Sequence, residues 1–157
     1  MSIAVVALLA WFVLSIYALV PKGLTLTDII FLYFLIGIFS ITLFTILDVN
    51  LRWVPLTRSV EGSFAMYISR FIVIPFPVLL SVSILNSQLK AKWRWGLSVI
   101  IVAFLCTANR IFLWADLITY RKWNEFYAAL MYGGLIVLMW WIARWFIGLN
   151  KGEFNKT

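Results

Sequence analysis

Five nearly continuous apolar runs dominate this 157-residue chain. Each is about as long as a helix needs to cross bilayer hydrocarbon, which is about 30 Å thick and takes roughly 20 residues. Only 12% of the residues are charged, and the connecting segments are too short and too apolar to form a separate soluble domain. The sequence therefore predicts a single membrane domain over residues 1–157. The five predicted spans are Ile3 to Val20, Asp28 to Leu47, Phe64 to Ser87, Trp95 to Ala115 and Glu125 to Leu149.

The apolar runs also indicate the fold class. Hydrocarbon offers no water to backbone N–H and C=O groups, so a spanning segment is either a helix or a strand of a closed barrel. Barrel strands alternate apolar and polar residues, whereas runs such as Ile29 to Ile38 do not alternate. A soluble domain of this length has room to bury only one or two such helices. We therefore expect an all-α fold, an integral membrane bundle of five transmembrane helices.

The first run resembles a secretory signal in position, but it lacks a basic segment before it and a small-x-small cleavage site after it. We expect it to be retained as a helix. Pro21 and Gly23 predict a short turn after it, and Thr25 with Asp28 predicts a capped start of the second span. The short turn predicts that spans one and two are antiparallel neighbours.

The third span carries Pro75 and Pro77, which remove two backbone donors and predict a kinked or locally unwound helix. One interpretation is a purely structural kink. The other is a functional feature, either a hinge or a polar cavity lined by freed carbonyls. This span is also the most polar, so it is expected to face protein rather than lipid. Its polar residues are Ser69, Ser81, Ser83, Asn86 and Ser87.

Basic residues predict the orientation. With five spans the termini lie on opposite faces, and the cluster of Lys90, Lys92 and Arg94 has little acid beside it. Cytoplasmic loops carry an excess of Lys and Arg, so we expect the N-terminus outside and the C-terminus in the cytoplasm. The net charge of +7 sits beside spans rather than on a solvated face. This placement favours anionic lipid headgroups over nucleic acid as partners.

Arg144 lies among the tryptophans of the fifth span and is expected to be an interfacial anchor. Two other arginines lie inside predicted spans, where a charge at the membrane centre costs about 2.5 to 3.5 kcal/mol. The topology places Arg70 and Arg110 in the same outer third of the bilayer. One alternative is that each arginine extends to the headgroups or forms a structural ion pair, and the other is a functional anion or substrate site. The candidate polar or anion site comprises Arg70, Asn109, Arg110, Asp116 and Asp48.

The composition argues against an enzyme. The chain has no histidine, the usual general base and the commonest metal ligand. The acids are scattered near span ends, no phosphate-cradling glycine loop or nucleophile elbow occurs, and Cys106 is the only cysteine. We therefore expect no enzymatic activity, no cofactor and no metal site.

Small residues occur four apart on the fifth span, at Ala129 and Gly133. A small-xxx-small face is typical of helix contacts in membranes. The partner of this face is another span of the chain, a second copy or another membrane protein.

The chain combines a proline-containing middle span, an acid after the second span and a Tyr-x-x-Trp turn before a last span that opens with aromatic and small residues. The residues of this pattern are Asp48, Pro75, Pro77, Trp93, Asn109, Arg110, Tyr120, Trp123, Phe126, Tyr127, Ala128 and Tyr132. In this pattern the last two thirds of the chain resemble a family of uncharacterised small multi-span membrane proteins from spore-forming Gram-positive bacteria. Where the family pattern has an acid in the penultimate span, this chain has Asn109 and Arg110. The resemblance implies a bacterial plasma-membrane location and supplies no activity.

Two functional hypotheses follow from the sequence. The first is a non-enzymatic subunit or accessory protein of a membrane assembly, with itself or with another membrane protein. The second is a small transporter or a lipid- or anion-binding protein in which Arg70 and Arg110 attract an anionic group near Pro75 and Pro77.

Overall fold

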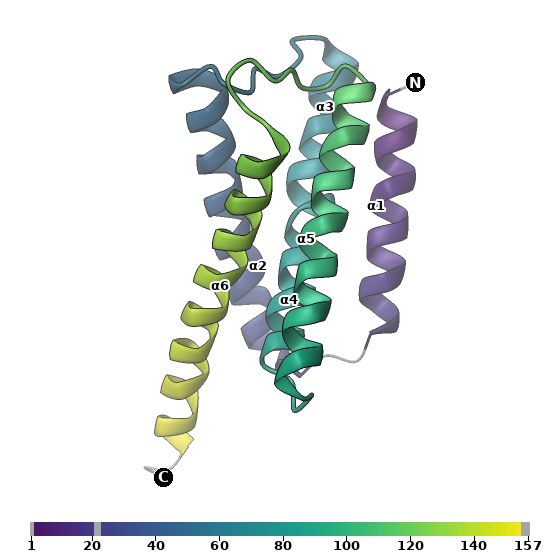
Figure 1. The fold of residues 1–157 in the computed structure, drawn as a ribbon. Helices are drawn as coiled ribbons and strands as arrows, with labels where there is room; N and C mark the ends of the chain where they lie inside the picture. The colour runs from purple at the N-terminus through teal and green to yellow at the C-terminus, as the bar shows by residue number, and fades with distance from the viewer. Residues whose placement is uncertain (1, 21–22, 155–157) are drawn as a thin grey trace.

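The computed structural model describes residues 2–20 and 23–154. This part of the chain forms five helices that run alternately in opposite directions (Figure 1), and it contains no strand, so the all-α prediction is confirmed. The helices are α1 (Ser2–Leu19), α2 (Leu26–Thr45) extended by the π-helical turn η1 (Ile46–Asn50), α3 (Val60–Ile68) continued by the π-helical turn η2 (Ser69–Val73) into α4 (Pro75–Leu85), α5 (Ala91–Trp114) and α6 (Glu125–Phe154).

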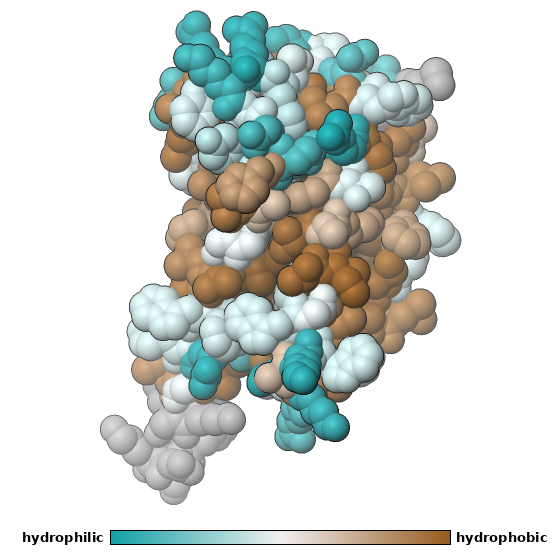
Figure 2. Space-filling model, viewed as in Figure 1, coloured by the Kyte–Doolittle hydropathy of each residue, from teal (hydrophilic) through white to brown (hydrophobic). Residues whose placement is uncertain are grey.

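Four of these helices are long and apolar enough to cross a membrane, and α1 contributes a shorter apolar helix, Ile3–Leu19. The four long helices are Leu26–Asn50, Val60–Leu85, Ala91–Trp114 and Glu125–Leu149. On the face shown in Figure 2, apolar side chains form a band across the middle of the bundle, and polar side chains gather at its two ends. The upper end in Figure 1 holds the start of α1 and the loops 51–59 and 115–124, and the lower end holds the loop 86–90.

The third helix, α3 to α4, is the centre of the bundle. About 67% of its most apolar window is buried, compared with 22 to 33% for the other three long helices. The expectation that this polar span faces protein is therefore confirmed. Its serines are satisfied inside the protein: Ser69 Oγ donates to the Ala65 carbonyl (3.0 Å) and Ser81 Oγ donates to Ser98 Oγ on α5 (2.9 Å).

The central helix separates α1 from α2. α1 packs against α3, η2 and α4, whereas α2 packs against η2, α4 and α6. The prediction that these two spans are neighbours is wrong, although they are antiparallel (Figure 1). The buried faces of both helices meet the third helix, the most buried of the long helices. The start of α2 does follow the prediction, because Thr25 and Asp28 form a reciprocal capping box.

The π-helical turn η2 lies immediately before the two prolines. The N–H of Ile74 donates to the Ser69 carbonyl five residues back (2.9 Å), and Pro75 then begins α4. In a regular helix the Phe71 carbonyl accepts from the N–H of residue 75, which proline lacks. Here that carbonyl accepts a hydrogen bond from the Tyr33 hydroxyl of α2 (3.0 Å). The carbonyl freed by Pro75 is thus satisfied by a side chain, and a bend of the axis at Pro75 and Pro77 stays a prediction.

Two loops close the upper end of the bundle. Thr57 N–H donates to the Leu117 carbonyl (2.9 Å) and Arg121 N–H donates to the Trp53 carbonyl (3.0 Å), so the loops lie against each other in extended conformation. Val54, Leu117 and Ile118 bury their side chains beneath these loops, against residues of α1, α3 and α5. This packing holds the segment after η1 in a fixed position over the helix ends.

Candidate anion site

The structure divides the residues of the predicted polar site among separate contacts. Arg110 and Asn109 are held by α6, Asp116 forms a turn, and only Asp48 and Arg70 face each other across a cavity. The division follows from the helix packing, because neighbouring positions on α5 point in different directions.

Arg110 forms an ion pair with the residue that begins α6. Its Nε lies 2.8 Å from Oε1 of Glu125, and the Arg110 side chain is about 70% exposed. A carboxylate in the first turn of a helix is also favoured by the helix dipole. Arg110 therefore belongs to a structural ion pair at the surface between α5 and α6.

Asn109 points into the protein instead. Its Oδ1 accepts a hydrogen bond from the buried Tyr132 hydroxyl of α6 (3.0 Å). Tyr120, in the loop between the two helices, lies close by. Burial raises the pKa of the Tyr120 hydroxyl to about 12, and the nearby Glu125 carboxylate acts in the same direction. This cluster is neutral and well packed, so it has no character of an anion site.

Asp116 has a backbone role. It adopts a left-handed conformation with φ of 54° directly after α5. The N–H of Asp116 donates to the Leu113 carbonyl (3.2 Å) and that of Leu117 donates to the Phe112 carbonyl (2.9 Å), which is a Schellman motif. Aspartate tolerates this conformation better than most residues. Its exposed side chain is not part of the cavity beside Arg70.

Arg70 forms no ion pair with a carboxylate among the described residues. It lies in η2 and is half-buried, with its guanidinium 5.5 Å from the centre of the Phe44 ring on α2. Its Nε is buried and has no hydrogen-bond partner among the described residues. The contact with the ring face is favourable for a cation but leaves the N–H donors unused.

Asp48, the nearest carboxylate, is already engaged. Its Oδ1 accepts a hydrogen bond from the N–H of Leu56 (3.0 Å), which ties the loop 51–59 to η1. The same oxygen lies 3.7 Å from Nη2 of Arg58, whose side chain is 81% exposed. An ion pair this long and this exposed is weak. The charge of Asp48 is therefore shared between a structural hydrogen bond and two arginines.

The two arginines line one cavity of about 210 Å³ between η1, the loop 51–59 and α3. Two guanidinium groups and one carboxylate leave it with an excess of one positive charge. Its polar wall consists of Asp48, Thr57, Arg58, Ser63, Tyr67 and Arg70. A neighbouring cavity of about 280 Å³ shares Asp48 and Arg58 and adds Arg52 and Arg121. We refer to the cavity lined by Arg58 and Arg70 as the arginine pocket.

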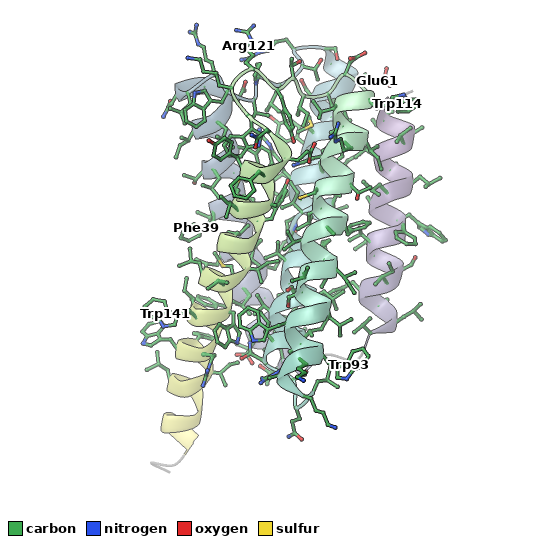
Figure 3. All side chains as sticks on the ribbon, viewed as in Figure 1. Phe39, Glu61, Trp93, Trp114, Arg121 and Trp141 are labelled. Atoms are coloured by element: carbon green, nitrogen blue, oxygen red, sulfur yellow. The ribbon has the colours of Figure 1, made fainter. Side chains whose placement is uncertain are left out.

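Sequence reasoning identified Arg70 and Asp48 but not Arg58, Thr57 or Tyr67. Arg58 lies in the loop 51–59, outside the predicted spans. Its position beside Asp48, ten residues earlier, was the available signal, because that loop is short enough to fold back. Arg121 is likewise brought to this end of the bundle by its own loop (Figure 3).

The remaining predicted residues lie away from the arginine pocket. Pro75 and Pro77 are buried in α4, and the half-buried Ala129 and Gly133 lie at the border of the packed face of α6. A Cβ atom added at Gly133 would meet nothing within 4 Å, so no neighbouring helix packs closely there. Among the described residues, no group of three or more His, Cys, Asp or Glu side chains is placed to hold a metal ion.

Comparison of the chain with protein-family models, with curated proteins and with solved structures finds no match.

Proposed function

We propose that the protein is a non-enzymatic, multi-pass protein of a bacterial plasma membrane whose arginine pocket binds an anionic oxygen group of the phosphate class. The observation that carries this proposal is Arg70, a half-buried guanidinium with unused donors that faces a cavity shared with Arg58. The bacterial location rests on the family resemblance of the sequence.

The apolar band supports the membrane placement. Helices of 24 to 26 residues reach about 36 to 39 Å at 1.5 Å per residue, enough for a hydrocarbon core of about 30 Å. Large apolar side chains are exposed on the outside of these helices, among them Phe34, Val99 and Leu130. Lipid is the solvent in which such a surface is favourable.

The charges at the lower end support an orientation with that end in the cytoplasm. Lys90 and Lys92 are exposed there, and Trp93 and Trp141 lie near the same end, opposite Glu61 and Arg121 (Figure 3). Basic loops favour the cytoplasmic side, and tryptophans favour the headgroup level. The arginine pocket would then lie at the outer interface, within reach of lipid headgroups and of anions in solution.

The chemistry of the pocket favours phosphate over a simple halide. Guanidinium groups present paired N–H donors that match the oxygens of phosphate or carboxylate. The Tyr67 hydroxyl lines the same wall and can donate to a further oxygen, whereas the Ser63 hydroxyl already donates to the Ser59 carbonyl (2.8 Å). A bound anion would accept hydrogen bonds from the unused Arg70 donors. These hydrogen bonds are the source of the expected affinity.

Native mass spectrometry of the full chain tests this proposal, with phosphatidylglycerol, phosphatidylcholine and inorganic phosphate as separate probes. We expect retention of phosphatidylglycerol to fall about tenfold or more in Arg70→Ala and Arg58→Ala, because a hydrogen bond to a charged group contributes about 1.5 to 3 kcal/mol. Arg70→Lys keeps the positive charge but lacks the paired N–H donors of a guanidinium. It should therefore weaken binding too.

Arg110→Ala is the matched control, because Arg110 lies at the same end but is paired with Glu125. Competition by inorganic phosphate would identify a soluble anion as the ligand, and its absence would identify a lipid headgroup. Binding that is equal in the wild type, Arg58→Ala and Arg70→Lys would refute the proposal.

A second candidate is a subunit or accessory role in a membrane assembly. It is favoured by the open surface at Gly133 and Gly134, where an added Cβ atom meets no neighbour. Substituting both glycines with leucine would block close helix approach there. Loss of an assembly seen for the wild type in gently extracted membranes would support this role, and an unchanged monomer would contradict it.

A further inference from the structure

We infer that a groove between α1 and α5, at the lower half of the bundle, binds one acyl chain of an anionic phospholipid from the leaflet on that side. The inference rests on the proposed membrane placement but not on the arginine pocket, which lies at the other end.

The groove exists because two helices share one neighbour. α1 and α5 both pack against α4, and no packing between α1 and α5 themselves links their described lower halves. Two cavities of about 290 Å³ and 900 Å³ lie in the space between them. Both are lined by Ile16 of α1, by Leu80 of α4, and by Ile100 and Ile101 of α5, so they form one continuous groove.

The inner part of the groove is lined by apolar side chains and ends at two aromatic rings. Its wall consists of aliphatic and aromatic side chains with Pro77. The rings of Phe12 on α1 and Phe104 on α5 meet with centroids 6.3 Å apart and lie at its inner end. Phe104 is 13 residues from the start of α5 at Ala91, about 20 Å along the helix axis.

This depth distinguishes between occupants. One leaflet of a bilayer provides about half of the roughly 30 Å of hydrocarbon. A groove that begins at the lower end and is closed by Phe12 and Phe104 matches a chain of one leaflet. A transmembrane helix would need an open channel along the full height of the bundle, which the two rings interrupt.

The outer part of the groove combines apolar side chains with four polar ones, and its surroundings are basic. Ser83, Asn86, Ser87 and Gln88 line the larger cavity. The exposed Lys90 and Lys92 follow directly in the chain, and the segment 85–95 contains no acid. Lysines at headgroup level attract anionic lipids. The groove is thus apolar along its inner part and has basic residues near its outer end. These properties match a lipid with an apolar chain and a negative headgroup.

Photocrosslinking tests the inference on the full chain in vesicles of phosphatidylglycerol and phosphatidylcholine. The probe is a phosphatidylglycerol with a diazirine at the end of one acyl chain, and peptide mass spectrometry locates the products. We expect labelling of residues 76–80 and 100–104 near the closed end of the groove. Ile100→Trp fills the groove and should largely abolish this labelling.

Val99→Trp is the matched control, because Val99 is the adjacent residue of α5, is about as exposed as Ile100 (65% against 63%) and does not line either cavity. Lys90→Gln with Lys92→Gln should remove the preference for phosphatidylglycerol over the corresponding phosphatidylcholine probe. Arg70→Ala should leave labelling of the groove unchanged, which separates this site from the arginine pocket.

Equal labelling in Ile100→Trp and Val99→Trp would overturn the inference. A dimer that Ile100→Trp dissociates, in the absence of lipid labelling, would also overturn it and identify a helix of a second copy as the occupant.

Discussion

The Tyr132 hydroxyl donates a hydrogen bond of 3.0 Å to Oδ1 of Asn109, and both side chains are buried between α6 and α5. This contact joins α5 and α6 near the upper end of the bundle. It also explains how a polar residue is accommodated inside the fourth predicted span. A buried amide is stable there because a partner on the neighbouring helix satisfies it.

Removing this hydrogen bond should destabilise the protein modestly. We expect Tyr132→Phe to lower the free energy of unfolding by about 0.6 to 1.7 kcal/mol, the range measured for hydrogen bonds between helices in membranes. Unfolding by SDS titration from mixed micelles measures the change. Tyr127→Phe is the control, because Tyr127 is an exposed residue of the same helix. Equal stability of wild type and Tyr132→Phe would show that the contact contributes nothing.

Two buried serines should respond differently to alanine. Ser81 donates to Ser98 on α5 (2.9 Å), and Ser98 donates to the Arg94 carbonyl (3.0 Å), so Ser81→Ala removes a link between α4 and α5. We expect a loss of about 0.6 kcal/mol. Ser40 is buried but its Oγ has no hydrogen-bond partner among the described residues, so Ser40→Ala should be neutral or stabilising. The same SDS titration compares the two, and a larger loss for Ser40→Ala would contradict this assignment.

The contact between Tyr33 and the Phe71 carbonyl should depend on Pro75. Tyr33→Phe leaves that carbonyl without its donor, at a cost of about 1 kcal/mol. Pro75→Ala supplies a backbone N–H in the same turn, so Tyr33→Phe should cost less in that background. A double-mutant cycle of unfolding free energies measures the coupling. Additive effects would mean that Tyr33 does not compensate for the proline.

Gly62 and Gly134 should differ in their tolerance of alanine. A Cβ atom at Gly62 would run into the Thr57 side chain and lie 2.7 Å from Ser59 Oγ, so Gly62→Ala should cost about 1 to 3 kcal/mol. At Gly134 an added Cβ atom meets nothing within 4 Å. Gly134→Ala should therefore be stabilising by up to about 1 kcal/mol, since alanine favours a helix. Thermal unfolding in detergent compares them, and a reversed order would contradict the packing around α3.

The local signals of the sequence led to correct predictions where the physics is local. Helix number follows from the apolar runs, and the start of α2 follows from Thr25 and Asp28, because a capping box involves residues only three apart. The central place of the third span followed from its serines, since hydroxyl groups favour protein over lipid. These inferences need no knowledge of which helices meet.

Local sequence signals did not predict which segments contact each other in the folded protein. A short turn indicated that α1 and α2 pair, but the third helix lies between them and packs against both. The predicted polar site placed Asn109 and Arg110 together, yet adjacent residues on a helix point about 100° apart, so one meets Tyr132 and the other Glu125. Arg58 entered the pocket through a loop whose course depends on Asp48 and on the loop 115–124.

The sequence by itself determined that this chain is all-helical, how many helices it forms and which helix is the most polar, because hydrophobicity and helix capping act over neighbouring residues. Only the tertiary structure decided that Arg70 faces the cavity with unused donors while Arg110 is paired. That outcome depends on how far each guanidinium lies from a carboxylate of another segment: Arg110 meets Glu125 at 2.8 Å, whereas the carboxylate nearest to Arg70 is already held by the Leu56 N–H.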